Sequence, residues 1–315
     1  MKNLYKHHNE ERHIMISNFK SKDILANIEK FFSYTSNLKS NLDYPKQRLL
    51  SYEELPPHLE LIYDNECIRK GYHPPPCSWK ETWGLLWSVH YETINIWSHL
   101  IGSFLFIGYL FDDLYNCDKN DYWMNLIYDF ASFTTFTFST LYHWLHIRCN
   151  STHNNCLCLD HFGVEINSFV TAVKFMKRLI GDDKLFDSYV MIQSYGFALA
   201  IMLLYQCWRS MEYGKLMNTS FGANVRLLLC ASHVFLLNIS IYHYYDEYHK
   251  VADFNDCNNL LALLITEISF ATATFIYVLK FPESIWPGKF DIYFNSHQIM
   301  HCVTLLTCVF VRYFT

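Results

Sequence analysis

The stretch FNSHQIMH, residues 294–301, opens the last apolar segment of the chain and contains two histidines four residues apart. Residues at this spacing lie one turn apart on the same face of a helix, so the imidazoles of His297 and His301 can bind one metal ion. The pattern therefore predicts that the chain ends in an apolar helix whose first turns carry two ligands of a metal site.

The composition of the whole chain indicates a membrane protein with a polar part. Of its 315 residues, 51% are hydrophobic and 18% aromatic, yet the mean hydropathy is only +0.01. Such a balance predicts a polar segment joined to an apolar one. The net charge of -5 comes without clusters of basic residues, which phosphate binding needs, so we expect no nucleic-acid partner.

The polar part is predicted to be the beginning of the chain. Residues 1–80 contain few apolar runs and are expected to form a soluble, partly disordered N-terminal region. Three successive prolines, residues 74–76, then break any helix. Residues 81–315 are expected to form the membrane domain, and the tryptophans at 79, 83 and 87 predict a helix along the membrane interface at its start.

Apolar segments of spanning length recur through the second part. The eighteen residues from Ile94 to Phe111 carry no formal charge, and a spanning helix needs roughly 20 largely apolar residues. The fold class that we predict is all-α, a seven-transmembrane helix bundle with a soluble N-terminal tail. The predicted spans are 94–111, 122–145, 159–180, 186–208, 223–245, 259–280 and 293–314.

Polar residues gather at the span ends that such a topology places on one membrane face. The first span begins with Asn95 and His99, one helical turn apart, and the second ends with Ser139 and His143 at the same spacing. Asp160 follows seventeen residues after His143, which is far enough for the chain to turn and return.

Together with the pair at the start of the seventh span, these residues predict a metal site. The pair His297 and His301, with His143 or His99 as a third imidazole and a carboxylate at the same depth, describes a catalytic-type zinc site, which has three protein ligands and an open fourth position for water. The eleven cysteines show no repeated short spacing, so they predict neither a zinc ribbon nor a disulfide framework.

Other histidines receive a different interpretation, because a lone histidine in a membrane helix is more often a packing or hydrogen-bonding residue. His233, without a partner in the sequence pattern, is expected to pack inside the bundle. His146, His153 and His161 lie in or beside the connection between the second and third spans and are expected to be solvated. His146 is close enough to His143 to remain a rival ligand.

The chain resembles the progestin and adipoQ receptor family, which includes the adiponectin receptors and is related to haemolysin III proteins and alkaline ceramidases. The resemblance covers about residues 69–315. It is carried by residues 71–75 (GYHPP), residues 92–102 (ETINIWSHLIG), Ser139-x-x-x-His143, Leu159-Asp160, residues 282–291 (PESIWPGKFD) and Ser296-His297-Gln298-x-x-His301.

The resemblance implies seven helices, a cytosolic N-terminus and a zinc ion (Zn2+) near the cytosolic face. It implies that zinc is held by His143, His297 and His301. It also implies two catalytic residues, Asp160, which holds the water at the metal, and Ser139, which supports the site.

Two functions from different classes are compatible with these residues. In the first, the chain is a multi-pass membrane receptor whose zinc site hydrolyses a lipid amide, as a ceramidase does, with Asp160 as the base. In the second, it is a non-enzymatic scaffold or signalling receptor in which zinc is only structural. Either way we expect an integral protein of the plasma membrane or of Golgi and other endomembranes. Its expected partners are the lipid bilayer, a lipid or protein-hormone ligand, and a cytosolic signalling protein that binds the N-terminal tail.

Overall fold

The computed structural model describes the residues that form the membrane domain and a short segment before it. These residues are 48–55, 63, 65–76, 78–115, 122–180, 183–211, 220–247 and 254–314. Residues 1–47, the larger part of the predicted soluble region, lie outside this set, so the disorder and the boundary of that region stay predictions.

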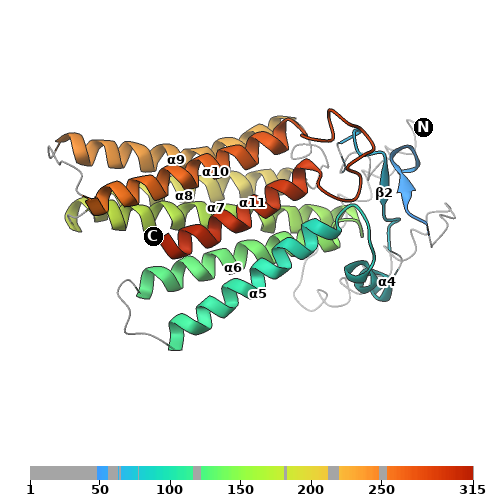
Figure 1. Cartoon of the computed structure of the whole chain (residues 1–315), viewed down its shortest axis with the longest axis horizontal. Helices are drawn as coiled ribbons and strands as arrows, with labels where there is room; N and C mark the ends of the chain where they lie inside the picture. Colours follow the sequence, from blue (N-terminus) through green and yellow to red (C-terminus); the bar gives the residue numbers. More distant parts are fainter. Residues whose placement is uncertain are drawn as a thin grey trace, which may run out of the picture. The chain divides into compact units, whose positions relative to one another are not determined.

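Long helices dominate the described residues, as the sequence predicted, and in Figure 1 they run side by side. The all-α part of the predicted fold class is therefore confirmed. The long helices are α5 (Thr93–Tyr115), α6 (Tyr122–Leu145), α7 (Asn150–Leu179), α8 (Asp183–Met211), α9 (Ser220–Glu247), α10 (Phe254–Val278) and α11 (Ser296–Phe314). Shorter elements precede them: β1 (Leu50–Ser51), the 3-10 helix η2 (Tyr52–Glu54), β2 (Lys70–Tyr72), α4 (Trp79–Gly84) and the 3-10 helix η3 (Leu85–Trp87).

Three of the long helices are sufficiently long and apolar to cross a membrane by length and composition. Within the described residues these stretches are Thr93–Tyr115, Leu185–Gln206 and Cys257–Val278. The other long helices carry more polar and charged side chains, several of which are buried between helices. A spanning helix keeps such side chains toward the bundle interior because they are costly in lipid.

The clearest set of buried charges lies where the C-terminal part of α11 meets α5 and α6. The guanidinium of Arg312 donates to Asp129 at 2.8 Å and to Asp113 at 2.7 Å, and both carboxylates are almost fully buried. Lys174 of α7 is also buried and donates to Asn125 at 2.8 Å. Pairing and hydrogen bonding explain how these segments tolerate formal charges.

The largest apolar cluster of the described residues lies between α5, α6, α7 and α11, with contributions from other helices. Phe106 of α5, Phe136 of α6, Phe175 of α7 and Val311 of α11 are fully buried members of it. These four helices therefore share one core, and they include the helices that carry the predicted metal ligands.

A glycine fixes the register between α6 and α7. A Cβ atom at Gly163 would lie 2.9 Å from the Cα of Thr135, so the two backbones approach where a larger residue would collide. The hydroxyl of Thr135 also donates to the carbonyl oxygen of Gly163 at 2.7 Å. The two helices are joined by a short connection and pack on each other, so they are antiparallel.

The segment before the membrane helices folds against the loop that precedes α11. Strands β1 and β2 pair antiparallel, and the backbone N–H of Arg69 donates to Asp291 at 2.9 Å. The side chain of Asn65 donates to Glu283 at 3.1 Å. These elements and α4 lie at the end of the bundle where α11 begins (Figure 1). The start of α11 is therefore held from outside the bundle as well as from within it.

Candidate metal centre

Two buried side chains determine where α11 begins. The carboxylate of Glu283 accepts a hydrogen bond from the backbone N–H of Ser296 at 2.8 Å, and the side chain of Asn295 accepts from the N–H of Gln298 at 3.1 Å. These bonds satisfy N–H groups that have no partner within the first turn of a helix. The helix therefore starts immediately before His297, and its first two turns present His297 and His301 to the bundle.

The third candidate ligand comes from the last turn of α6. His143 is buried, and its Nδ1 lies 2.8 Å from a carboxylate oxygen of Glu92, the residue before α5. An ionised carboxylate only accepts hydrogen bonds, so Nδ1 of His143 carries the proton. The lone pair of its Nε2 is then available on the opposite side of the ring.

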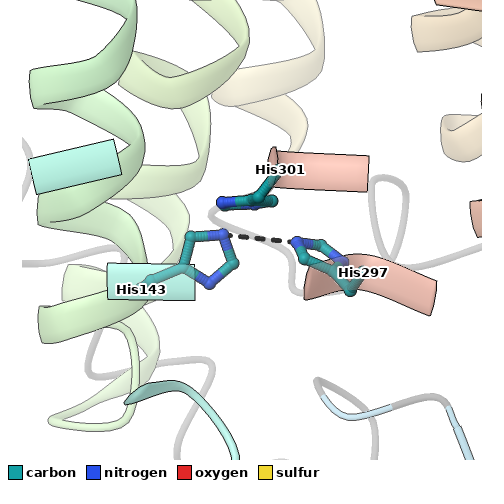
Figure 2. Close-up of side chains that lie close together, drawn as sticks. All are labelled: His143, His297 and His301. Carbon is teal, nitrogen blue, oxygen red and sulfur yellow. Dashed lines mark hydrogen bonds between the residues drawn. The ribbon is translucent and has the colours of Figure 1, made fainter. Parts of the chain in front are cut away.

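The structure brings the three predicted metal ligands together. One ligand atom from each of His143, His297 and His301 lies within 4.8 Å of the others, and Figure 2 shows the three rings converging. The Nε2 atoms of His143 and His297 are 3.3 Å apart. His143 and His301 are buried, whereas His297 is half-buried beside the ring of Tyr277 of α10.

The donor set fits a zinc ion. Zinc binds imidazole nitrogen at about 2.0–2.1 Å in a tetrahedron, which places neighbouring nitrogens roughly 3.3 Å apart. The distance between the Nε2 atoms of His143 and His297 has this value. Imidazole nitrogen is a good ligand for zinc, as it is for copper, iron and nickel. These three residues could therefore hold the ion and leave one coordination position open.

Glu92 is a site residue whose role the sequence did not reveal. Its carboxylate also accepts a hydrogen bond from the side chain of Asn95 at 2.6 Å. Burial raises the pKa of a carboxyl group, but the neighbouring imidazoles, foremost the hydrogen-bonded His143, outweigh burial and hold the pKa of Glu92 below its ordinary value. When a ligating histidine donates its second ring N–H to an ionised carboxylate, the carboxylate fixes the orientation of the imidazole and raises the basicity of the imidazole.

His146 is not placed as a ligand, and the expectation that it is solvated is wrong. It is buried, its Nδ1 donates to the carbonyl oxygen of Tyr142 at 3.1 Å, and its Nε2 accepts from the hydroxyl of Tyr63 at 2.9 Å. Burial lowers the pKa of His146 to about 4, so the ring is neutral at physiological pH. Both nitrogens are therefore engaged away from the metal centre.

The expectation that His153 is solvated is also wrong, because this residue is buried inside α7, which begins at Asn150 rather than at residue 159. His233 packs inside the bundle, as expected. It also has polar neighbours there, since its Nε2 lies 3.2 Å from Glu165 and its Nδ1 lies 3.2 Å from the side-chain oxygen of Gln193. The third and fifth predicted spans thus share polar contacts that single-span patterns do not show.

The proposed catalytic residues lie on α6 and α7. Ser139 is buried one helical turn before His143, and Asp160 is half-buried in α7. Asp160 is not a member of the group of ligand atoms within 4.8 Å of one another. Its role at the metal and that of Ser139 stay predictions.

Glu92→Gln tests the carboxylate behind His143. The substitution keeps the shape of the side chain but removes its charge, and loss of such an outer partner typically lowers metal affinity about 10- to 100-fold. We expect a shift of this size in the zinc dissociation constant, measured by competition with a zinc-sensitive chelator. The control is Glu53→Gln, since Glu53 is exposed in η2, and an equal shift in both variants would contradict the role given to Glu92.

Comparison with known proteins finds one family and several relatives. A family model described as haemolysin-III related matches residues 87–313. The chain is 27% identical over 279 residues to progestin and adipoQ receptor-like protein 1 of Caenorhabditis elegans, which covers 85% of this chain and 60% of that protein. It is 25% identical over 283 residues to the adiponectin receptor protein of Drosophila melanogaster, covering 84% of this chain and 58% of that protein.

A human relative is matched over more of its own length. The chain is 24% identical over 273 residues to membrane progestin receptor gamma of Homo sapiens, covering 82% of this chain and 78% of that protein. By contrast, the chain spans about three fifths of the length of the nematode relatives that it matches.

Proposed function

Because the chain belongs to the haemolysin-III related family and its relatives are progestin and adipoQ receptors, we propose that it is a multi-pass membrane receptor with a zinc site among its helices. The zinc-dependent activity that we assign to it is hydrolysis of a lipid amide. All seven long helices, α5 to α11, cross the membrane in this proposal, and the N-terminus is cytosolic. The membrane is the plasma membrane or an endomembrane such as the Golgi.

The observation that carries the proposal is the convergence of three imidazoles from two helices. His143 of α6 and the pair on α11 meet within 4.8 Å although 154 residues separate His143 from His297. The buried carboxylate of Glu92 is hydrogen-bonded to His143 and orients its ring. Zinc sites typically combine imidazole ligands with such a hydrogen-bonded carboxylate behind them. Three protein ligands leave a position open, which favours chemistry over a closed structural site.

Zinc bound there would supply a Lewis acid that lowers the pKa of a water molecule toward about 7 and polarises an amide carbonyl. The chain supplies the remaining functions. Asp160 accepts the proton of the attacking water and passes it to the leaving amine, so the amide gives a fatty acid and an amine. Ser139, one turn from His143, orients these groups by hydrogen bonding.

The register between α6 and α7 supports this placement of Asp160. Thr135 faces Gly163 at a close contact between the two helices. The connection between the two helices follows the end of α6 and precedes the start of α7. One turn closer to this connection than the contact, α6 carries Ser139 and α7 carries Asp160. The two residues are thus expected at the same level of the bundle, one turn before His143.

The substrate class follows from where the site lies. His297 is half-buried beside Tyr277 of α10, so this candidate ligand is partly accessible from outside the site. The helices that surround it expose many large apolar side chains, which suit contact with lipid. A lipid whose polar amide enters between the helices while its chains remain in the bilayer matches both features.

A structural role for zinc is the second candidate. The three ligands connect the end of α6 to the start of α11, and two of them are fully buried. An ion held there would fasten the two helices, and a ligand would act by moving them or the N-terminal tail. A cytosolic signalling protein that binds the tail is the partner in either case.

The experiment that tests the proposed hydrolysis compares one protein preparation in two metal states. Protein purified in detergent and reconstituted into lipid should cleave N-acylsphingosine, and a chelator should abolish the activity because the Lewis acid is removed. Adding zinc back should restore the rate. If zinc-containing protein cleaves neither this lipid nor other long-chain amides, the structural role stands instead.

A further inference from the structure

His99 of α5 is a buried imidazole that the metal site does not use. Its side chain lies between the ring of His301, with centroids 3.8 Å apart, and the ring of Phe136, at 4.9 Å. The residue is only 5% exposed, and neither of its ring nitrogens has a hydrogen-bond partner among the described residues. Buried polar groups without partners are rare in folded proteins, so each one needs an explanation.

Neighbouring buried histidines show that this end of the fold usually provides partners. His90 donates from Nε2 to the carbonyl oxygen of Leu85 at 3.1 Å and accepts at Nδ1 from the N–H of Glu92 at 3.2 Å. His146 likewise uses both nitrogens. Simple packing therefore does not account for His99, because a phenylalanine would stack equally well without leaving two polar atoms unpaired.

The geometry also excludes His99 as a fourth metal ligand. The rings of His99 and His301 are stacked with only 18° between their planes. A metal bound to His301 lies in the plane of that ring and hence well outside the plane of His99. An imidazole binds metal through a lone pair in its own plane, so His99 cannot reach the same ion from this position.

A second unpaired polar atom lies one turn away on the same helix face. The side chain of Asn95 donates its amide N–H to Glu92, but its buried oxygen has no hydrogen-bond partner within the described part of the chain. Residues at i and i+4 are neighbours on a helix surface. Asn95 and His99 together thus present hydrogen-bonding atoms that the protein leaves unused beside the metal centre.

We infer that His99 is a binding residue for the polar group of the ligand, with Asn95 as its neighbour in the same subsite. This inference rests on the proposed function, because it places the ligand next to the metal. A neutral imidazole has one N–H donor and one acceptor nitrogen, and the oxygen of Asn95 is a further acceptor. An uncharged group with both an acceptor and a donor, such as the amide of a lipid, satisfies this set. A charged headgroup does not.

The test uses stearoyl hydroxamate, a long-chain probe that combines an amide-like group with affinity for zinc. His99→Phe keeps the stacking on His301 and Phe136 but removes both nitrogens. Loss of one hydrogen bond weakens binding by up to about tenfold, so we expect this increase in the dissociation constant at unchanged zinc content. His99→Gln, which retains a donor and an acceptor, should bind the probe more tightly than His99→Phe.

The matched control is His243→Phe. His243 lies near the end of α9, which connects to the start of α10 at the opposite end of the bundle from the metal centre, and its Nδ1 already pairs with Tyr189 at 2.6 Å. Probe binding to this variant should equal that of the wild type. Thermal unfolding of all variants shows whether each is folded.

The outcomes separate this inference from the proposed function. Equal probe affinity in His99→Phe and the wild type, with zinc present in both, would overturn the role of His99 alone. Loss of zinc from a folded His99→Phe protein would also overturn it, since His99 would then serve the metal. A wild type that binds no zinc would overturn the proposed function and this assignment together.

Discussion

Replacing His297 or His301 by alanine is expected to remove zinc from the protein and to lower its thermal stability at the same time. Each variant loses one of the three candidate ligands of the site. An ion that binds only the folded state stabilises it by mass action, by about 3 kcal/mol when free zinc is about 100 times its dissociation constant. Elemental analysis and thermal unfolding, each with and without a chelator, measure the two effects.

The matched control for these variants is His146→Ala. His146 is buried and hydrogen-bonded to Tyr63 and Tyr142, so its removal should cost stability. The zinc content of the His146→Ala protein should nevertheless stay at the wild-type level. A chelator should still lower the unfolding temperature of this variant. Equal loss of zinc from the His146 variant and from the His297 variant would show that the ligand set is assigned wrongly.

Asp160→Asn should separate catalysis from metal binding. The amide keeps the size of the side chain but cannot accept the proton, and a positioned base typically contributes about 10²–10⁴-fold to the rate. We expect hydrolysis of N-acylsphingosine to fall by this factor while the zinc content remains at the wild-type level. The rate per zinc ion, measured in reconstituted protein, is the quantity to compare.

An exposed aspartate provides the control for that substitution. Asp187→Asn changes a solvent-facing residue of α8 and should leave the rate unchanged. If the wild type contains zinc, cleaves the lipid and is not slowed by Asp160→Asn, another group is the base. If the wild type contains zinc but hydrolyses no lipid amide, the role of the metal is structural, namely to connect α6 to α11.

The long helices and the pairing of His297 with His301 on one helix face could be predicted from the sequence because both depend on local spacing. His143 joined this pair only through the resemblance to a known family, because it lies 154 residues before His297. Apolar runs marked the helices to within a few residues at most ends, and the pair His297 and His301 required only one helical turn. The start of α7 was missed because its first turns are polar. Within residues 151–155 the buried His153 faces into the bundle, and hydropathy does not reveal this.

Contacts between distant parts of the chain could not be predicted from spacing. Glu92 and His143 are 51 residues apart, and Arg69 and Asp291 are 222 residues apart. No local pattern links such pairs, although each helps to position a helix that carries metal ligands. The partners of His233 were missed for the same reason, since Gln193 is 40 residues away on another helix.

X-ray absorption at the zinc edge, on wild-type protein purified in detergent, tests the metal centre directly. We expect about one zinc ion per chain with three imidazole nitrogens at about 2.0–2.1 Å and one oxygen ligand. Sulfur ligands at about 2.3 Å would instead indicate that some of the eleven cysteines bind the metal. That result, or protein that contains no zinc, would contradict a metal centre formed by His143, His297 and His301.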